Sequence, residues 1–369
     1  MTHPMIEDLS SARQQIDALD QQIQTLISQR ARIAQAIAHI KQRMGDTGDH
    51  YRPAREAEVL RAVIARNQAN GGPLTDEAIA RLMREIMSAC LSLESPLTVA
   101  YLGPEGTYTQ AAVLKQFGDS VRARANSAID EIFRDVESGA ADYGVVPVEN
   151  SIGGVVSHTL DELVHTKLRI CGEVTLPVHH HLLATSADLS KVTKIYAHPQ
   201  SFAQCRKWLD AKVPKAIRET VSSNGQGAAQ VREEGDGVAA IASLQAGRIH
   251  GLEILASNIE DDPSNTTRFL VIGKQDPTAT GQDITSIVLT GHRNQPGSLL
   301  RLLQPLSAAG LDMTRIESRP VKGSAIYDYY FFIDFAGSSA TPEVRKALDE
   351  VAAAAAFFKV LGSYPRAVV

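Results

Sequence analysis

The sequence predicts a chain of three parts: an all-helical N-terminal domain, a central two-lobed α/β domain and a C-terminal α+β domain. Helical periodicity alone marks residues 1–95, strands and helices alternate over 97–274, and the order βαββαβ follows over 283–369. Ser95-Pro96 and the Gly- and Pro-containing stretch Asp276–Asp283 are the predicted linkers. A length of 369 residues suits two or three domains.

Composition narrows the class of protein. An apolar content of 44% and a charged content of 21% are typical of a globular protein, and a net charge of −5 gives nucleic-acid binding no bulk support. No apolar run is long enough to span a membrane and the N-terminus lacks a signal core, so a cytoplasmic protein is expected. The cysteines are far apart and lack a CxxC pair, which argues against disulfides or zinc: Cys90, Cys171 and Cys205.

The N-terminal domain is expected to contain three helices. Residues 10–43 carry apolar side chains at three-and-four spacing, Pro53–Asn67 forms a second helix, and Asp76–Glu94 forms a third after the N-cap Thr75. A single helix of about 33 residues spans roughly 50 Å and cannot bury its own apolar stripe. Packing against a second subunit is therefore expected.

The same helices carry cations with a defined geometry. Arg30 and Lys41 lie 11 positions apart, about 20° on a helical wheel, so they share a face. Arg13 points about 100° from Arg30, which fits a pocket in a partner subunit better than one in its own. Cys90 and Glu94 share one face of the third helix. Such a pocket would suit a small dicarboxylate, although a solvated helix face is the alternative.

The α/β domain has two loops that suggest a shared cleft. The buried strand 143–148 runs into Glu149-Asn150-Ser151 and a Gly-Gly pair, while the loop 265–269 (NTTRF) runs into a strand over 270–273. The glycine loop GPEGTYT at 103–109, between a strand and a helix, is typical of anion binding but lacks a P-loop lysine, which argues against ATP. A polar turn after a strand is the alternative interpretation.

The chain is expected to cross to a second lobe near residue 175 and to return near 255. Val174–Leu183 is predicted as the crossing strand, and Ile195–His198 as a strand that ends in His-Pro-Gln-Ser. Consecutive histidines at 179–181 would alternate faces in a strand and could not bind one metal, so no metal or cofactor is expected.

The last domain is expected to run strand 284–290, helix 298–309, strand 313–321, strand 327–335, helix 342–356 and strand 358–363. This order is ferredoxin-like. Its polar features are the first loop, Asn294–Ser298, and the strand segment Glu317–Pro320. The segment contains no pairing of a nucleophile with a base, which indicates a regulatory domain.

Taken together, these motifs resemble those of the bifunctional chorismate mutase–prephenate dehydratases with a C-terminal ACT domain. GPEGTYT, VVPVENSIGG, HPQSF, NTTRF, NQPGSL and ESRP occur in the expected order over nearly the whole chain. The resemblance implies a helical chorismate mutase dimer and a dehydratase with the two-lobed fold of periplasmic binding proteins. It also implies an ACT domain that binds phenylalanine between subunits and feedback inhibition, in a homodimer or higher homo-oligomer.

The resemblance assigns a chorismate pocket to the helical domain. A unimolecular rearrangement needs no nucleophile, only cations for both carboxylates and a donor to the ether oxygen. Lys41 is the expected donor, with Arg30 and Glu94 as the other catalytic residues. Three positions depart from better-known members: Arg52, Cys90 and Glu94 stand where Asp, Ser and Gln are common. The implied chorismate-binding residues are Arg13, Arg30, Lys41, Arg52, Arg55, Glu56, Cys90 and Glu94.

For the dehydratase, the resemblance makes Thr267 the residue most closely tied to activity. The reaction needs a proton donor to the leaving hydroxyl and anchors for the carboxylates. The implied prephenate-binding residues are Thr107, Glu149, Asn150, Ser151, His198, Gln200, Thr267, Arg268 and Phe269. The implied phenylalanine-binding residues are Asn294, Gln295, Pro296, Gly297, Ser298, Leu299, Glu317, Ser318 and Arg319.

Two other functions fit parts of the pattern. A two-lobed amino-acid-binding or transport protein would not need the basic helical domain and would be expected to carry a signal peptide. A monofunctional dehydratase with a degenerate mutase segment would be favoured by a broken cation set, but Arg13, Arg30, Lys41 and Arg55 are all present.

Overall fold

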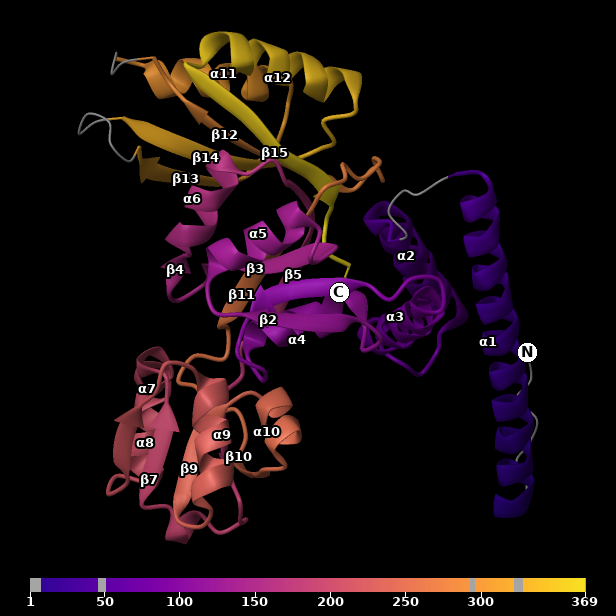
Figure 1. Ribbon diagram of the computed structural model, residues 1–369, viewed down its shortest axis with the longest axis vertical. Coiled ribbons are helices and arrows are strands. Elements are labelled where there is room, and N and C mark those ends of the chain that lie inside the picture. The colour runs from indigo at the N-terminus through magenta and orange to yellow at the C-terminus, as the bar shows by residue number, and fades with distance from the viewer. Residues whose placement is uncertain (1–7, 46–50, 293–295, 322–327, 369) are drawn as a thin grey trace.

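The computed structural model describes residues 8–45, 51–292, 296–321 and 328–368. It has the predicted helical, two-lobed α/β and βαββαβ parts, arranged as Figure 1 shows, with the helical part beside the first lobe and the C-terminal domain against the side opposite the second lobe. No helix in the described part of the chain is long and apolar enough to cross a membrane.

The helical domain consists of α1 (Leu9–Arg43), α2 (Pro53–Asn70) and α3 (Asp76–Ser92). Thr75 caps α3, because its hydroxyl accepts a hydrogen bond from the Ala78 N–H. Figure 1 shows α1 standing apart from the body of the molecule, with α3 and α2 between them. Its apolar stripe is accordingly exposed: Ile16, Leu19, Ile23 and Leu26 are each more than half accessible to solvent.

The first lobe is built on a mixed sheet in the order β2-β1-β3-β11-β5, with β4 paired to β3. Its strands are β1 (Thr98–Leu102), β2 (Arg122–Asn126), β3 (Tyr143–Asn150), β4 (Gly154–Val155), β5 (Arg169–Pro177) and β11 (Thr266–Gly273). Its helices are α4 (Tyr108–Phe117), α5 (Ile129–Ser138) and α6 (Ser157–His165). The returning strand β11 lies between β3 and β5 and is antiparallel to both, which sets the two predicted polar motifs side by side.

The second lobe has a sheet in the order β10-β6-β9-β7-β8. The strands are β6 (His181–Ala184), β7 (Lys194–Ala197), β8 (Ile217–Thr220), β9 (Val238–Ala242) and β10 (Glu253–Ala256). The helices are the short η1 (Leu189–Lys191), α7 (Pro199–Gln204), α8 (Arg206–Lys212), α9 (Asn224–Glu234) and α10 (Leu244–His250).

The crossing between the lobes differs from the sequence prediction. The single strand expected over Val174–Leu183 is two strands, because β5 ends at Pro177 and β6 begins at His181. His179 and His180 lie in the connection, so the three histidines do not alternate along one strand. Two of them instead contact a residue far away in the sequence: Glu260 lies 2.7 Å from the His179 ring and accepts a hydrogen bond from the His180 N–H.

The C-terminal domain has the expected order of β12 (Asp283–Thr290), α11 (Ser298–Ala308), β13 (Met313–Pro320), β14 (Tyr329–Ala336), α12 (Pro342–Ala354) and β15 (Phe357–Pro365). Its antiparallel sheet has the order β13-β14-β12-β15, the ferredoxin-like arrangement. Both helices cover one face of this sheet (Figure 1).

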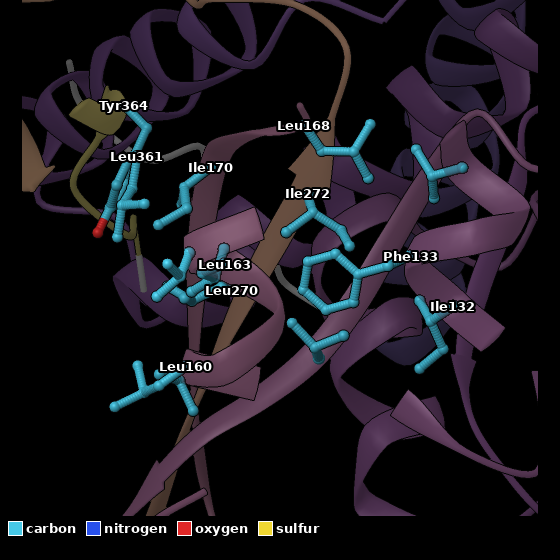
Figure 2. Packing of buried hydrophobic residues seen from close by; sticks show 14 of the residues in the cluster. Ile132, Phe133, Leu160, Leu163, Leu168, Ile170, Leu270, Ile272, Leu361 and Tyr364 are labelled. Atoms are coloured by element: carbon cyan, nitrogen blue, oxygen red, sulfur yellow. The ribbon is translucent and has the colours of Figure 1, made fainter. Parts of the chain in front are cut away.

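The other face of that sheet is packed against the first lobe. Phe332, Leu361 and Tyr364 belong to one buried cluster with Ile170 and Leu270 of the first-lobe sheet. Figure 2 shows Leu361 and Tyr364 beside Ile170, from strands far apart in the sequence. The C-terminal domain therefore shares part of its core with the first lobe.

Candidate active sites

A cavity of about 840 Å³ lies between the two lobes. The first lobe contributes the glycine loop after β1 and the facing ends of β3 and β11, and the second lobe contributes the N-terminal turns of α7 and α9. The lobes approach closely here: a Cβ on Gly225 would lie 2.5 Å from the Glu105 carbonyl oxygen, which explains why glycine occupies that position. Ser243 also donates a hydrogen bond from its hydroxyl to the Gly106 carbonyl, at 2.8 Å.

Thr267 lies in this cavity with its hydroxyl held from one side. Asn150 donates from Nδ2 to Thr267 Oγ1 at 2.9 Å and to Asn265 Oδ1 at 2.8 Å. The amide of Asn150 can point only this way, because its Oδ1 accepts from the N–H groups of Ile152 and Gly153 at 3.1 and 2.7 Å. The Thr267 oxygen thus serves as an acceptor towards Asn150, and its own proton is left to donate into the cavity.

The facing wall supplies neutral donors and acceptors from the second lobe. His198 caps α7 by accepting at Nδ1 from the Gln200 N–H, 3.2 Å away, so the proton of the neutral ring is on Nε2. Behind it, His180 Nε2 lies 2.8 Å from Gln204 Oε1, and Tyr108 lies 3.1 Å from His180 Nδ1. Burial lowers the pKa of His180, which favours its neutral form.

The lining of this cavity contains no Asp, Glu, Lys or Arg among the residues that the structure describes. Besides the short α7, the N-terminal turns of two longer helices reach it instead, α4 at Thr107–Thr109 and α9 at Ser223–Gly225. Unpaired N–H groups and the helix dipole make such turns suited to an anion. One lies on each lobe, so a ligand with two carboxylates could engage both.

Six of the nine expected prephenate-binding residues line the cavity: Thr107, Asn150, His198, Gln200, Thr267 and Phe269. The other three do not. Ser151 accepts a hydrogen bond from the Thr266 N–H through its hydroxyl. Glu149 forms an ion pair with Arg315 of β13 at 2.8 Å, and Arg268 forms ion pairs with Glu173 and Asp334 on the opposite face of the sheet.

Sequence reasoning assigned no role in the cleft to several polar residues of the lining: Asn126, Ser127, His180, Gln204, Ser222, Ser223, Asn224 and Asn265. Asn265 stood within the quoted NTTRF stretch but was given no role. Ser223 could have been found from the sequence as a helix N-cap, because serine is preferred there; in the structure it caps α9 and accepts a hydrogen bond from the Gln226 N–H.

In the helical domain, Lys41 and Glu94 are brought together. The Lys41 ammonium lies 3.1 Å from Glu94 Oε1, with side chains 19% and 7% exposed, and Cys90 is buried one turn before Glu94. Arg13 is 28 positions from Lys41, about 42 Å along α1, so one subunit does not bring these two together. Arg30 lies about 16 Å from Lys41 by the same rise.

The remaining residues expected to bind chorismate lie on α2. Arg52 precedes its first turn and is exposed, and Arg55 is exposed and pairs with Glu58 at 3.1 Å. Glu56 points elsewhere, to the side of the helical domain that faces the first lobe, and forms a largely buried ion pair with Arg84 of α3 at 3.0 Å. Burial raises the pKa of Glu56, although the Arg84 guanidinium partly offsets this.

Of the residues expected to bind phenylalanine, Asn294 and Gln295 lie outside the described residues. Pro296 and Gly297 precede α11, Ser298 and Leu299 begin it, and Glu317, Ser318 and Arg319 lie on the edge strand β13. Arg319 reaches the first lobe, where it donates hydrogen bonds to Ser157 and, at 3.3 Å, to Asp161 of α6.

Three family models match this chain in succession: chorismate mutase type II over residues 12–95, prephenate dehydratase over 99–277 and ACT domain over 285–353. A bifunctional chorismate mutase/prephenate dehydratase from Stutzerimonas stutzeri is 50% identical over 98% of this chain and 99% of that protein. One from Pseudomonas aeruginosa is 49% identical with the same coverage. A crystal structure of a prephenate dehydratase from Arthrobacter aurescens in complex with L-Phe matches with a TM-score of 0.67 and 33% identity, over 74% of this chain and 93% of that one.

Proposed function

Because this chain belongs to the family of bifunctional chorismate mutase/prephenate dehydratases, we propose that each reaction uses the site described for its domain. The helical domain rearranges chorismate to prephenate, and the two-lobed domain converts prephenate to phenylpyruvate. The observation that carries the second assignment is the Thr267 hydroxyl oxygen, which lines the cavity and accepts a hydrogen bond from Asn150, so that its own proton is left for the substrate.

In the dehydratase step, Thr267 donates a hydrogen bond to the leaving ring hydroxyl. The bond from the ring to the carboxylate breaks, its electron pair enters the ring, and carbon dioxide is released. The hydroxyl leaves with the electrons of its bond to the ring, stabilised by the Thr267 hydrogen bond, and takes up a proton from solvent to form water. Aromatisation supplies the driving force, so the protein needs only to orient the substrate and assist the leaving group. The N-terminal turns of α4 and α9 hold the carboxylates, in place of the Arg268 contact expected from the sequence.

In the mutase step, Lys41 donates to the ether oxygen as negative charge develops on it, and Arg30 binds a carboxylate. Arg13 completes the pocket from a second subunit, since about 42 Å of helix separates it from Lys41. The exposed apolar stripe of α1 supports this dimer, because Ile16, Ile23 and Leu26 are each left more than half exposed by the residues that the structure describes. Glu94 stays a proposed site residue beside Lys41.

Phenylalanine is the proposed effector of the C-terminal domain. The solved relative was crystallised with L-Phe, and the ACT family match covers residues 285–353 of this chain. The segment Pro296–Leu299 and the strand segment Glu317–Arg319 are the proposed contacts, as the family resemblance implies.

Two variants of the full chain test the assignment of sites. With chorismate as substrate and prephenate and phenylpyruvate followed separately, Lys41→Ala should stop prephenate formation while added prephenate is still converted. Thr267→Ala should let prephenate accumulate. Loss of both activities in either variant, with unfolding temperature unchanged, would contradict two independent sites.

A further inference from the structure

Strands β3 and β11 of the first lobe each carry a residue that lines the cavity and, next to it in the sequence, a residue that forms an ion pair with the C-terminal domain. Thr267 and Asn150 are register partners on β11 and β3, and so are Arg268 and Glu149. Successive side chains of a strand point to opposite faces, so the first pair faces the cavity and the second faces the C-terminal domain. Whatever fixes Arg268 and Glu149 therefore fixes the backbone that carries Thr267 and Asn150.

The C-terminal domain meets them with a complementary register pair. Arg315 on β13 and Asp334 on β14 are partners in its sheet. The charges are exchanged between the sheets: Arg268 Nη1 lies 2.7 Å from Asp334 Oδ2, and Arg315 Nε lies 2.8 Å from Glu149 Oε2. We call these four residues, Glu149, Arg268, Arg315 and Asp334, the interdomain interlock.

The hydrogen bonds around Arg268 form a closed set. Its Nε donates to Glu173 at 2.9 Å and its Nη2 to the Tyr364 hydroxyl at 3.0 Å. Ser286 donates to Asp334 Oδ1 at 2.6 Å, so the Tyr364 proton is directed to Ser286 Oγ, 2.9 Å away. The guanidinium is thus held at three nitrogens by side chains of β5, β14 and β15 and is not directed at the cavity.

The side chains of the interdomain interlock are largely buried, and their directed hydrogen bonds fix the geometry of the contact. The side chains of Arg268, Asp334 and Arg315 are only 19%, 7% and 12% exposed, and Glu149 is 39% exposed. A guanidinium that binds carboxylates through directed N–H groups fixes orientation as well as distance. The Arg268 contacts also lie next to an irregularity in the β3–β11 register, between Arg268 and Phe269, where the ladder alone constrains the strand less.

We propose that Arg268 and Glu149 are positioning residues for the dehydratase reaction: through the interdomain interlock, the seated C-terminal domain holds Thr267 and Asn150 in their productive geometry. This rests on the proposed role of the cavity as the prephenate site. Arg315 lies two residues from Glu317 on β13, within the strand that carries the proposed phenylalanine contacts. A shift of this strand would therefore reach the Glu149–Asn150 strand end through a single ion pair.

The test uses full-length Asp334→Asn, Arg315→Gln, Glu149→Gln and the Arg315→Gln/Glu149→Gln double variant, with prephenate as substrate. Displacing reacting groups by about 1 Å can cost about a hundredfold in rate, so kcat should fall roughly 10- to 100-fold with KM within about twofold. The double variant should be no slower than the worse of its two single variants, because both remove one interaction. Arg268→Lys should also lower dehydratase kcat, although it keeps the positive charge, because an ammonium cannot reproduce three directed donors.

A matched control separates positioning from loss of folding. Lys359→Met removes another interdomain contact, the bonds from Lys359 to the Leu163, Val164 and Thr166 carbonyls, without touching β3 or β11. It should leave dehydratase kcat unchanged, and an unfolding temperature equal to that of wild type shows that a variant is folded. A rise in KM with unchanged kcat in the interlock variants would make Arg268 or Glu149 a substrate contact and overturn the proposal. Interlock variants with the kcat and KM of wild type would also overturn it, and so would a loss of kcat in Lys359→Met as large as theirs. Failure of wild type to convert prephenate would overturn the proposed function instead.

Discussion

Asn150→Asp is an isosteric change that should redirect a single proton. In the wild type, the Asn150 amide donates to Thr267 Oγ1 at 2.9 Å, which leaves the threonine proton for the substrate. A carboxylate oxygen in the same place would accept that proton. The leaving hydroxyl would then lose its donor, and one such donor is worth roughly 10²–10³ in kcat. The cost in stability should be small, because Asn265 can turn its amide: its Nδ2 is buried with no partner among the described residues.

The assay is phenylpyruvate formation from prephenate across pH 5 to 9, with the non-enzymatic rate subtracted. At the alkaline end, kcat of Asn150→Asp should be lower than that of wild type by roughly 10²–10³. It should recover as the pH falls and the introduced carboxyl group regains a proton that it can donate to Thr267. Asn150→Ala, which has no titrating group, should show a loss independent of pH. Parallel pH profiles for the two variants, or a kcat of Asn150→Asp near that of wild type, would refute the proton assignment.

Three further outcomes follow from contacts elsewhere. A Glu94 carboxylate beside Lys41 cannot donate a hydrogen bond to the ether oxygen, so mutase activity should fall as the pH rises and Glu94 loses its proton. Glu94→Gln should flatten this fall and raise alkaline turnover by roughly a hundredfold, because an amide donates at any pH; identical pH profiles would contradict this role of Glu94. The raised pKa of Glu56 means that the folded state holds the proton of this carboxyl group more tightly than the unfolded chain does. The contribution of Glu56 to the free energy of unfolding is therefore greatest below the ordinary pKa of a glutamate and declines as the pH rises through the pKa of the folded state. Urea unfolding at several pH values should show a shallower decline of stability with pH in Glu56→Gln. A chain ending at Gly273 should fail to unfold cooperatively and lose dehydratase turnover, since β12, β14 and β15 supply part of the first-lobe core; an active, cooperatively unfolding truncation would contradict that shared core.

The division into three parts followed from periodicity and linkers, but several elements carried too weak a signal to be predicted. The edge strands β2 and β8 are polar sequences, RARAN and IRET, and neither has a run of buried apolar residues. The α9 sequence begins NGQG, and glycine lowers helix propensity. Its glycines are there for tertiary reasons: a Cβ on Gly227 would lie 3.2 Å from Tyr196 Cβ, and Gly225 adjoins the Glu105 carbonyl. Single-sequence patterns do not contain such contacts.

The motifs of the dehydratase site were found as blocks, yet a strand divides each block between two faces. The stretches ENS (149–151) and TRF (267–269) were each treated as one continuous site, and every residue in them was assigned to the substrate. Once Thr267 and Asn150 face the cavity, the alternation of side chains turns Arg268 and Glu149 to the other side. A charged side chain there would be costly to bury without a partner, and the partners come from β13 and β14, more than forty residues beyond Thr267. The alternation could have been applied to the sequence alone; the identity of the partners could not, because it depends on how the third sheet is seated on the first.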